Sequence, residues 1–186
     1  SKNKEVYYTL GNARFKAKNY TDAIEAYDNA IALGANDEII FNNRGKAKLN
    51  AGMVKESIQD FDRALGIKPD YTQALKNRAA ARYQLKAYPE VVSDLAIVAS
   101  RNEAGGDEFA ALGISKYHTK DAKGAVEALT RAVENSNSSI DVYAARGSSY
   151  VELKEYEKSI ADLNKAIDGG LTDADLFFKR GVAKYM

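Results

Sequence analysis

Small and apolar residues recur along the chain at a constant spacing of 34 residues. The clearest column contains glycine or alanine, at Gly11, Gly45, Ala79, Gly113, Gly147 and Gly181. A large apolar residue lies four positions before each member of this column. No insertion or deletion is needed to keep the columns aligned. This regularity indicates that the chain is built from copies of one structural unit, which we call a repeat.

Each repeat contains two predicted helices. In the first repeat, small or apolar residues lie three or four positions apart, as they do along one side of a helix. In the first predicted helix these residues are Tyr7, Leu10, Gly11 and Phe15, and in the second they are Ala23, Ile24, Tyr27 and Ala30. Polar residues 19–22 predict a turn between them, with Thr21 or Asp22 as the helix cap. One such pair cannot bury its apolar face alone, so we expect an all-α solenoid of stacked helix-turn-helix repeats.

The spacing divides the chain into five complete repeats and the start of a sixth. The complete repeats are residues 4–37, 38–71, 72–105, 106–139 and 140–173. Residues 174–186 are predicted to form the first helix of an incomplete sixth repeat. Phe177 and Gly181 keep the pattern of a helix that is followed by a second one, whereas a terminal solenoid helix has a polar outer face. We therefore expect the chain to be part of a longer protein, or its last helix to pack on another chain.

A 34-residue helix pair with these small and aromatic columns resembles the tetratricopeptide repeat family. The first repeat fills most columns of the family motif, with Tyr7, Leu10, Gly11, Tyr20, Ala23, Tyr27 and Ala30. Pro69 provides the closing proline of the motif in the second repeat, and the other repeats lack it. The resemblance implies a right-handed superhelix. It also implies a scaffold or adaptor that binds a protein or an extended peptide in a concave groove lined by the first helices.

The composition argues against an enzyme. The chain has no cysteine and one histidine, His118, which disfavours disulfides, thiolate zinc sites and catalytic triads. We find no set of nucleophile and base and no phosphate-binding loop, so we expect no catalytic residue, metal or cofactor.

The charge and hydropathy of the chain limit the other ligand classes. A formal net charge of +1 disfavours nucleic acid as the main ligand, because phosphate binding needs a basic excess. No apolar run approaches ~18 residues, so we expect no membrane span and a soluble protein of the cytoplasm or the bacterial periplasm.

Exposed positions of the predicted first helices supply the candidate binding residues. The residues expected to contact a partner are Tyr8, Asn12, Lys16, Asn43, Lys46, Lys76, Tyr83, Tyr117 and His118. Tyr83 and Tyr117 belong to a largely apolar column that either anchors a ligand or packs between neighbouring first helices.

Charge is distributed unevenly between the repeats. Residues 38–105 carry 11 basic and 8 acidic side chains, a net charge of +3, and residues 106–173 carry 8 and 12, a net charge of −4. A peptide with an acidic segment would complement the basic, amide-rich end of the groove. The alternative interpretation is that these are ordinary solvated charges.

Two other functions stay open from the sequence. One is a co-chaperone-like domain, in which a clamp of lysine, asparagine and arginine side chains would hold an acidic C-terminal tail. Asn12 and Asn43 match that clamp, whereas its three cations are replaced by Tyr8, Gln73 and Asn77. A clamp without cations should bind carboxylates weakly. The other is a structural scaffold that self-associates through its last half repeat.

A column of basic residues lies one position before the small residues. Its arginines are Arg44, Arg78, Arg146 and Arg180. They either contact an anionic ligand or pair with acidic side chains on the preceding helix. Asp60, Asp94 and Asp162 recur at one column of the second helices and are the candidate partners.

Overall fold

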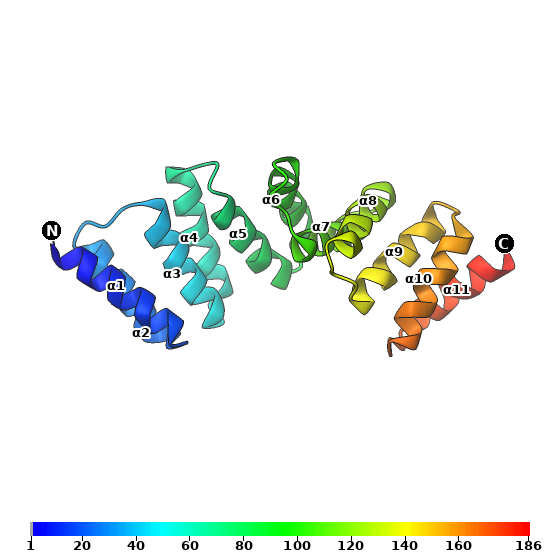
Figure 1. Ribbon diagram of the computed structural model, residues 1–186, viewed down its shortest axis with the longest axis horizontal. Coiled ribbons are helices and arrows are strands. Elements are labelled where there is room, and N and C mark those ends of the chain that lie inside the picture. Colours follow the sequence, from blue (N-terminus) through cyan, green and yellow to red (C-terminus); the bar gives the residue numbers. More distant parts are fainter. Residues whose placement is uncertain (1) are drawn as a thin grey trace. The chain divides into compact units, whose positions relative to one another are not determined.

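The computed structural model describes residues 2–186, and in that range it contains α-helices and no β-strand (Figure 1). The helices form two compact units. The N-terminal unit ends at Lys86 and contains α1 (Lys2–Lys16), α2 (Tyr20–Ala32), α3 (Glu38–Asn50), α4 (Val54–Ile67) and α5 (Thr72–Gln84). The C-terminal unit begins at Ala87 and contains α6 (Tyr88–Ser100), α7 (Gly106–His118), α8 (Ala122–Glu134), α9 (Ile140–Glu152), α10 (Tyr156–Asp168) and α11 (Ala174–Tyr185). The predicted all-α fold of consecutive helix pairs is confirmed.

The helices pack in pairs within each unit. In the N-terminal unit α1 packs on α2 and α3 on α4, and in the C-terminal unit α7 packs on α8 and α9 on α10. The predicted repeat 72–105 holds α5 and α6, which belong to different compact units. The repeat boundaries given above stay a prediction.

The glycine column lets a large side chain of the second helix lie against the backbone of the first. A Cβ atom on Gly45 would lie 2.7 Å from Phe61 Cε1, and one on Gly113 would lie 2.5 Å from Leu129 Cγ. Phe61 and Leu129 are fully buried. The small residue is therefore a packing requirement of the helix pair, because the interior is already filled to close contact. Gly181 of α11 differs, since no atom lies within 4 Å of its Cβ position.

The turns repeat together with the helices. The turn after each first helix contains a residue with positive φ, at Lys18, Gly52, Lys86, Lys120 and Lys154. This left-handed conformation stops a helix, although it is uncommon for residues other than glycine. The turn after the second helix uses it at Gly34, Asn102, Ser136 and Gly170. Lys68, the corresponding residue of α4, is extended with φ −133, because the ring of Pro69 restricts the residue before it.

The cap of α2 lies earlier than the sequence analysis placed it. Asn19 is the N-cap, and its Oδ1 accepts a hydrogen bond from the backbone N–H of Asp22 at 3.5 Å. The prediction of Thr21 or Asp22 as the cap was wrong, because all three residue types cap helices and the hydrophobic pattern does not choose among them.

The arginine column forms ion pairs, beginning with Arg44 of α3. Arg44 Nε and Nη2 donate to the two carboxylate oxygens of Asp60 on α4 at 2.9 and 2.5 Å. Its Nη1 donates to Asp28 on α2 at 2.6 Å. Asp60 is 4% exposed and also pairs with Lys48 at 2.8 Å. Burial lowers the pKa of Arg44, but hydrogen bonds to Asp60 and Asp28 outweigh it and raise the pKa above its ordinary value.

The other arginines of the column also donate hydrogen bonds to a neighbouring helix. Arg78 donates to Asp62 at 2.6 Å, Arg146 to Asp162 at 2.6 and 3.0 Å, and Arg180 to Asn164 at 2.9 Å. The hydrogen bond to Asp162 raises the pKa of Arg146. These arginines tie helices together within each unit. Asp28 and Asp62 lie on the helix that precedes their arginine, as predicted. Asp60 and Asp162 lie on the helix that follows it, which was not predicted.

Candidate functional site

A pocket of about 200 Å³ lies in the N-terminal unit between α1 and α3, the first helices of two successive pairs. We call it the α1–α3 pocket, and its lining residues are Asn12, Phe15, Lys16, Tyr27, Asn43 and Lys46. Four of them, Asn12, Lys16, Asn43 and Lys46, are predicted partner-binding residues. Phe15 and Tyr27 add aromatic surface to these polar groups.

Gly11 positions the Tyr27 ring in this pocket. A Cβ atom at residue 11 would lie 2.6 Å from Tyr27 Cε1, so a larger residue would push the ring away from α1. In this position Tyr27 Oη donates a hydrogen bond to Asn12 Oδ1 at 2.8 Å. Burial, together with the nearby Tyr8, raises the pKa of Tyr27, so the phenol stays protonated and can donate at neutral pH.

Asn43 joins α3 to α1 through its side-chain amide. Its Nδ2 donates to Asn12 Oδ1 and to Tyr8 Oη, each at 3.2 Å. Asn12 Oδ1 therefore accepts two hydrogen bonds, one from Tyr27 and one from Asn43. The result is a fixed arrangement of amide groups beside the pocket.

The amide network continues to α5. Asn42 Nδ2 donates to Asn43 Oδ1 at 3.3 Å, Asn77 Nδ2 donates to Asn42 Oδ1 at 2.8 Å, and Gln73 Nε2 donates to Asn77 Oδ1 at 3.2 Å. Tyr8, Gln73 and Asn77 occupy the positions where the co-chaperone clamp carries cations. Here these neutral side chains hydrogen-bond within the chain.

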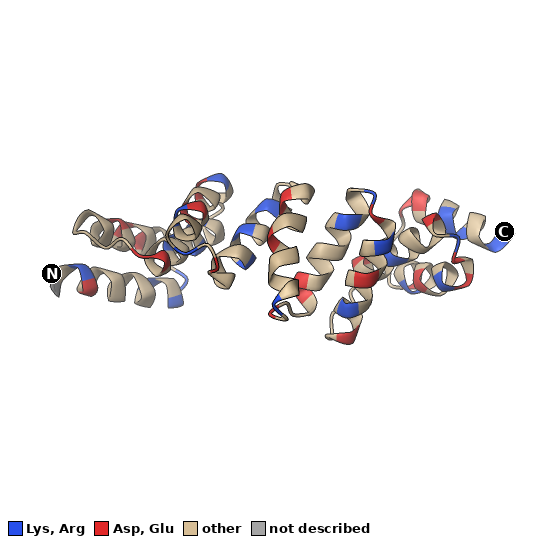
Figure 2. Ribbon diagram, turned by 90° about the horizontal axis from the view of Figure 1, so that it is seen from above, with Lys and Arg blue, Asp and Glu red and all other residues tan. Residues whose placement is uncertain are grey.

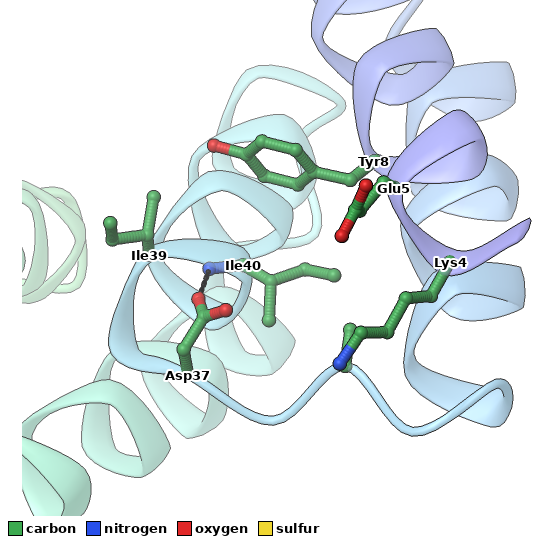
Figure 3. Close-up of a pocket in the computed structure, with 7 residues that line it drawn as sticks. Lys4, Glu5, Tyr8, Asp37, Ile39 and Ile40 are labelled. Atoms are coloured by element: carbon green, nitrogen blue, oxygen red, sulfur yellow. Dashed lines mark hydrogen bonds between the residues drawn. The ribbon is translucent and has the colours of Figure 1, made fainter. Parts of the chain in front are cut away.

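A second pocket of about 170 Å³ lies beside Tyr8, at the N-terminal ends of α1 and α3 (Figure 3). Lys4, Glu5 and Tyr8 of α1 face Asp37, Ile39 and Ile40 of the loop and the start of α3, and Ala35 completes the lining. Asp37 Oδ1 accepts a hydrogen bond from the Ile40 backbone N–H at 2.8 Å and so caps α3. This pocket therefore combines charges of both signs with apolar surface.

Lys76 and Tyr83, the other predicted residues of the N-terminal unit, lie on α5. Both are partly buried, and neither lines the two pockets described above. They are not brought together with the residues of α1 and α3 at either pocket.

Tyr117 of the C-terminal unit is contacted by a residue 62 positions away. Lys179 Nζ of α11 donates to Tyr117 Oη at 2.8 Å and lies 5.3 Å from the centre of its ring. Lys179 also forms an ion pair with Asp175. Burial lowers the pKa of Lys179, but hydrogen bonds to Asp175 and Tyr117 outweigh this effect and raise it. The polar end of Tyr117 is therefore already engaged within the chain.

His118 packs against an aromatic residue of α6. Its ring stacks on Tyr88 with centroids 4.1 Å apart and planes 11° apart. The His118 side chain is nevertheless exposed to solvent. The structure thus places it in a surface aromatic pair with Tyr88.

The Lys179 contact was missed by sequence reasoning, although a signal existed. Asn43, Asn77 and Lys179 all lie two positions before the small-residue column. Asn43 and Asn77 were considered as binding or clamp positions, and extending the same column to the last repeat would have drawn attention to Lys179.

Charged side chains of both signs occur on the helices of each unit (Figure 2). Both signs are present within each unit, although α2 and α6 carry only acidic charged side chains and α5 only basic ones. No helix within residues 2–186 combines the length and apolar character needed to cross a membrane.

Comparison with known proteins identifies the type of repeat. A family model described as "TPR repeat" matches residues 11–52, and one described as "Tetratricopeptide repeat" matches residues 40–71 and 140–168. No curated protein matches the chain.

Solved structures share the fold at low sequence identity. MamA (41-end) from Desulfovibrio magneticus RS-1 is 17% identical with a TM-score of 0.78, over 91% of this chain and 96% of that one. MamA AMB-1 is 20% identical with a TM-score of 0.81, over 90% and 99% of the two chains. YrrB, described as a TPR protein with an unusual peptide-binding site, is 19% identical with a TM-score of 0.74, over 87% and 84%. The repeat pattern, the paired helices and the family matches together show that the chain belongs to the tetratricopeptide repeat family.

Proposed function

We propose that the chain is a non-catalytic scaffold that binds an extended peptide segment of a partner protein, with the α1–α3 pocket as the main contact. The observation that carries this proposal is the meeting of Asn12, Lys16, Asn43 and Lys46 around one pocket. YrrB, a structural neighbour described as having a peptide-binding site, supports peptide binding as a use of this fold.

The chemistry of the pocket suits a peptide. The centre of the Phe15 ring lies 5.5 Å from that of Tyr20 and 5.5 Å from Lys46 Nζ, so both neighbours restrict this ring. Rigid aromatic rings give contact area at low entropic cost, and the amide network holds Asn12 and Asn43 in place before a ligand arrives. Side chains of these types can hold both the apolar and the polar parts of a peptide.

A co-chaperone-like clamp is the weaker proposal. Its cationic positions are occupied by Tyr8, Gln73 and Asn77, which form neutral hydrogen bonds within the chain. An acidic tail held at those positions would lack the charge-assisted hydrogen bonds that make such clamps strong.

The groove proposal predicts that reversing two lysine charges weakens partner binding. In the double variant Lys46→Glu and Lys76→Glu, acidic side chains replace two cations on α3 and α5, so they should repel an acidic partner and weaken its binding. The measurement is a pull-down from a lysate of the source organism, with captured proteins quantified by mass spectrometry and helicity followed by circular dichroism.

The matched control is Lys55→Glu with Lys123→Glu, which changes the net charge equally at exposed positions of α4 and α8. The proposal would be supported by proteins that the wild type and the control capture and that the Lys46→Glu and Lys76→Glu variant loses at unchanged helicity. Equal capture by all three proteins would contradict this location of the site.

Self-association through α11 is a separate proposal. Phe178 and Tyr185 of this helix are 70% and 90% exposed. Burial of these side chains against a second copy would stabilise a dimer. We expect light scattering to show a mass that rises with protein concentration, and a rise that is lost in Phe178→Ser. A strict monomer at all concentrations would remove this proposal.

A further inference from the structure

We propose that the α1–α3 pocket is a carboxylate-binding subsite. In it, Lys16, Lys46 and the side-chain amide of Asn12 would hold an Asp or Glu side chain, or the C-terminal carboxylate, of the bound peptide. This inference rests on the proposed groove function, and it names the chemistry that the groove selects.

The hydrogen bonds of Asn12 occupy the oxygen of its side-chain amide and leave the nitrogen available. Its Oδ1 accepts from Tyr27 Oη and from Asn43 Nδ2, which uses both lone pairs of that oxygen. The reverse orientation of the amide would set its donor against the Asn43 donor, so the network fixes which end is the oxygen. Among residues 2–186, Asn12 Nδ2 has no hydrogen-bond partner. Asn12 therefore offers a donor, and not an acceptor, to a ligand.

Lys16 and Lys46 both line the pocket as cations. Within the described part of the chain, neither Lys16 nor Lys46 forms an ion pair with a carboxylate. Lys48, two positions after Lys46 on α3, pairs with buried Asp60 at 2.8 Å. Lys46 Nζ instead lies 5.5 Å from the centre of the Phe15 ring, which keeps the ammonium at the pocket. Two cations from α1 and α3 thus meet at one pocket with no acid between them.

The lining residues of the two pockets differ in their charges. No Asp or Glu lines the α1–α3 pocket, whereas the neighbouring pocket contains Glu5 and Asp37 beside Lys4. A carboxylate is therefore attracted to the first pocket and repelled from the acidic side of the second, which would set the register of the peptide. The lining therefore favours an anionic group, and the carboxylates of Asp, Glu and the C-terminus are the anionic groups of an unmodified peptide.

This subsite uses cations that the co-chaperone clamp does not use. Lys16 and Lys46 lie at other columns of the repeat than the clamp positions Tyr8, Gln73 and Asn77. Asn12 is common to both arrangements. The inference therefore describes a different site on the same surface.

The test begins with a displayed library of random 12-residue peptides, selected in parallel on three versions of the full chain. They are the wild type, the groove variant Lys16→Gln with Lys46→Gln, and the control Lys55→Gln with Lys123→Gln. We expect peptides selected by the wild type and the control to be enriched in Asp and Glu. The groove variant should still select peptides through the remaining groove surface, without that enrichment.

The second step measures affinity by fluorescence anisotropy with one peptide from the wild-type selection. Replacing its acidic residue by the matching amide, or replacing the two lysines by glutamine, should each weaken binding by roughly five- to tenfold at low salt. The two changes together should cost little more than either one, because both remove the same contact. Versions with a free and an amidated C-terminus distinguish a side-chain carboxylate from a terminal one.

Peptides enriched without Asp or Glu would overturn the carboxylate subsite and leave the groove function standing. The same holds for an acidic preference that survives in the groove variant. A wild type that enriches no peptide would overturn the groove function and, with it, this inference.

Discussion

Replacing Asp60 by alanine is expected to lower the free energy of unfolding by about 3 kcal/mol, because it leaves two cations in a largely buried site without their counter-ion. Asp60 is 4% exposed and receives two hydrogen bonds from Arg44 and an ion pair from Lys48. The measurement is urea denaturation followed by far-UV circular dichroism.

Asp28→Ala is the matched control for Asp60→Ala. Asp28 pairs with the same Arg44 at 2.6 Å, but its side chain is 53% exposed. Exposed ion pairs contribute ~0–1 kcal/mol, so this variant should unfold close to the wild type. Equal destabilisation by the two variants would show that burial of Asp60 does not decide the strength of the pair.

Replacing Gly113 by alanine should also destabilise the chain, in the C-terminal unit. The added Cβ would lie 2.5 Å from Leu129 Cγ and 3.0 Å from the Leu129 backbone nitrogen, and the backbone cannot move aside as a side-chain tip can. Overpacking of this kind costs about 1–3 kcal/mol, offset by the ~1 kcal/mol that alanine gains over glycine in a helix. We expect a net loss of stability in thermal and urea unfolding.

Gly181→Ala tests the same column without the packing constraint. Nothing lies within 4 Å of that Cβ position, so the gain in helix propensity should dominate and raise stability slightly. The two glycine variants should therefore change stability in opposite directions. A change of the same sign in both would contradict the packing role of the column.

The fold was predictable because one physical requirement recurs in the pairs α1–α2, α3–α4, α7–α8 and α9–α10. A glycine and a large residue 16 positions later must touch for two helices to approach closely, as Gly113 and Leu129 do. Such a contact leaves a clear trace in the sequence, since both positions are restricted at the same spacing. The arginine column left a similar trace, although the sequence did not show that Arg44 pairs with acids on both the preceding and the following helix.

The state of the candidate site residues was less predictable. The spacing indicated that Asn43 and Tyr117 face the groove, but not that Asn43 donates to Tyr8 and Asn12, or that Lys179 reaches Tyr117. These contacts depend on side-chain rotamers and on how successive pairs rotate about one another within a unit. A sequence column specifies neither of these, so the engaged residues could not be separated from the free ones.

The most direct test of the central claim is an NMR titration of the chain with an acidic peptide selected on it. The account predicts that the largest shifts fall on α1 and α3, and that the side-chain amide of Asn12 shifts on binding. The double variant Lys16→Gln and Lys46→Gln should reduce these shifts at the same peptide concentration. Shifts confined to the second helices α2 and α4, or to the C-terminal unit, would contradict a binding site in the α1–α3 pocket.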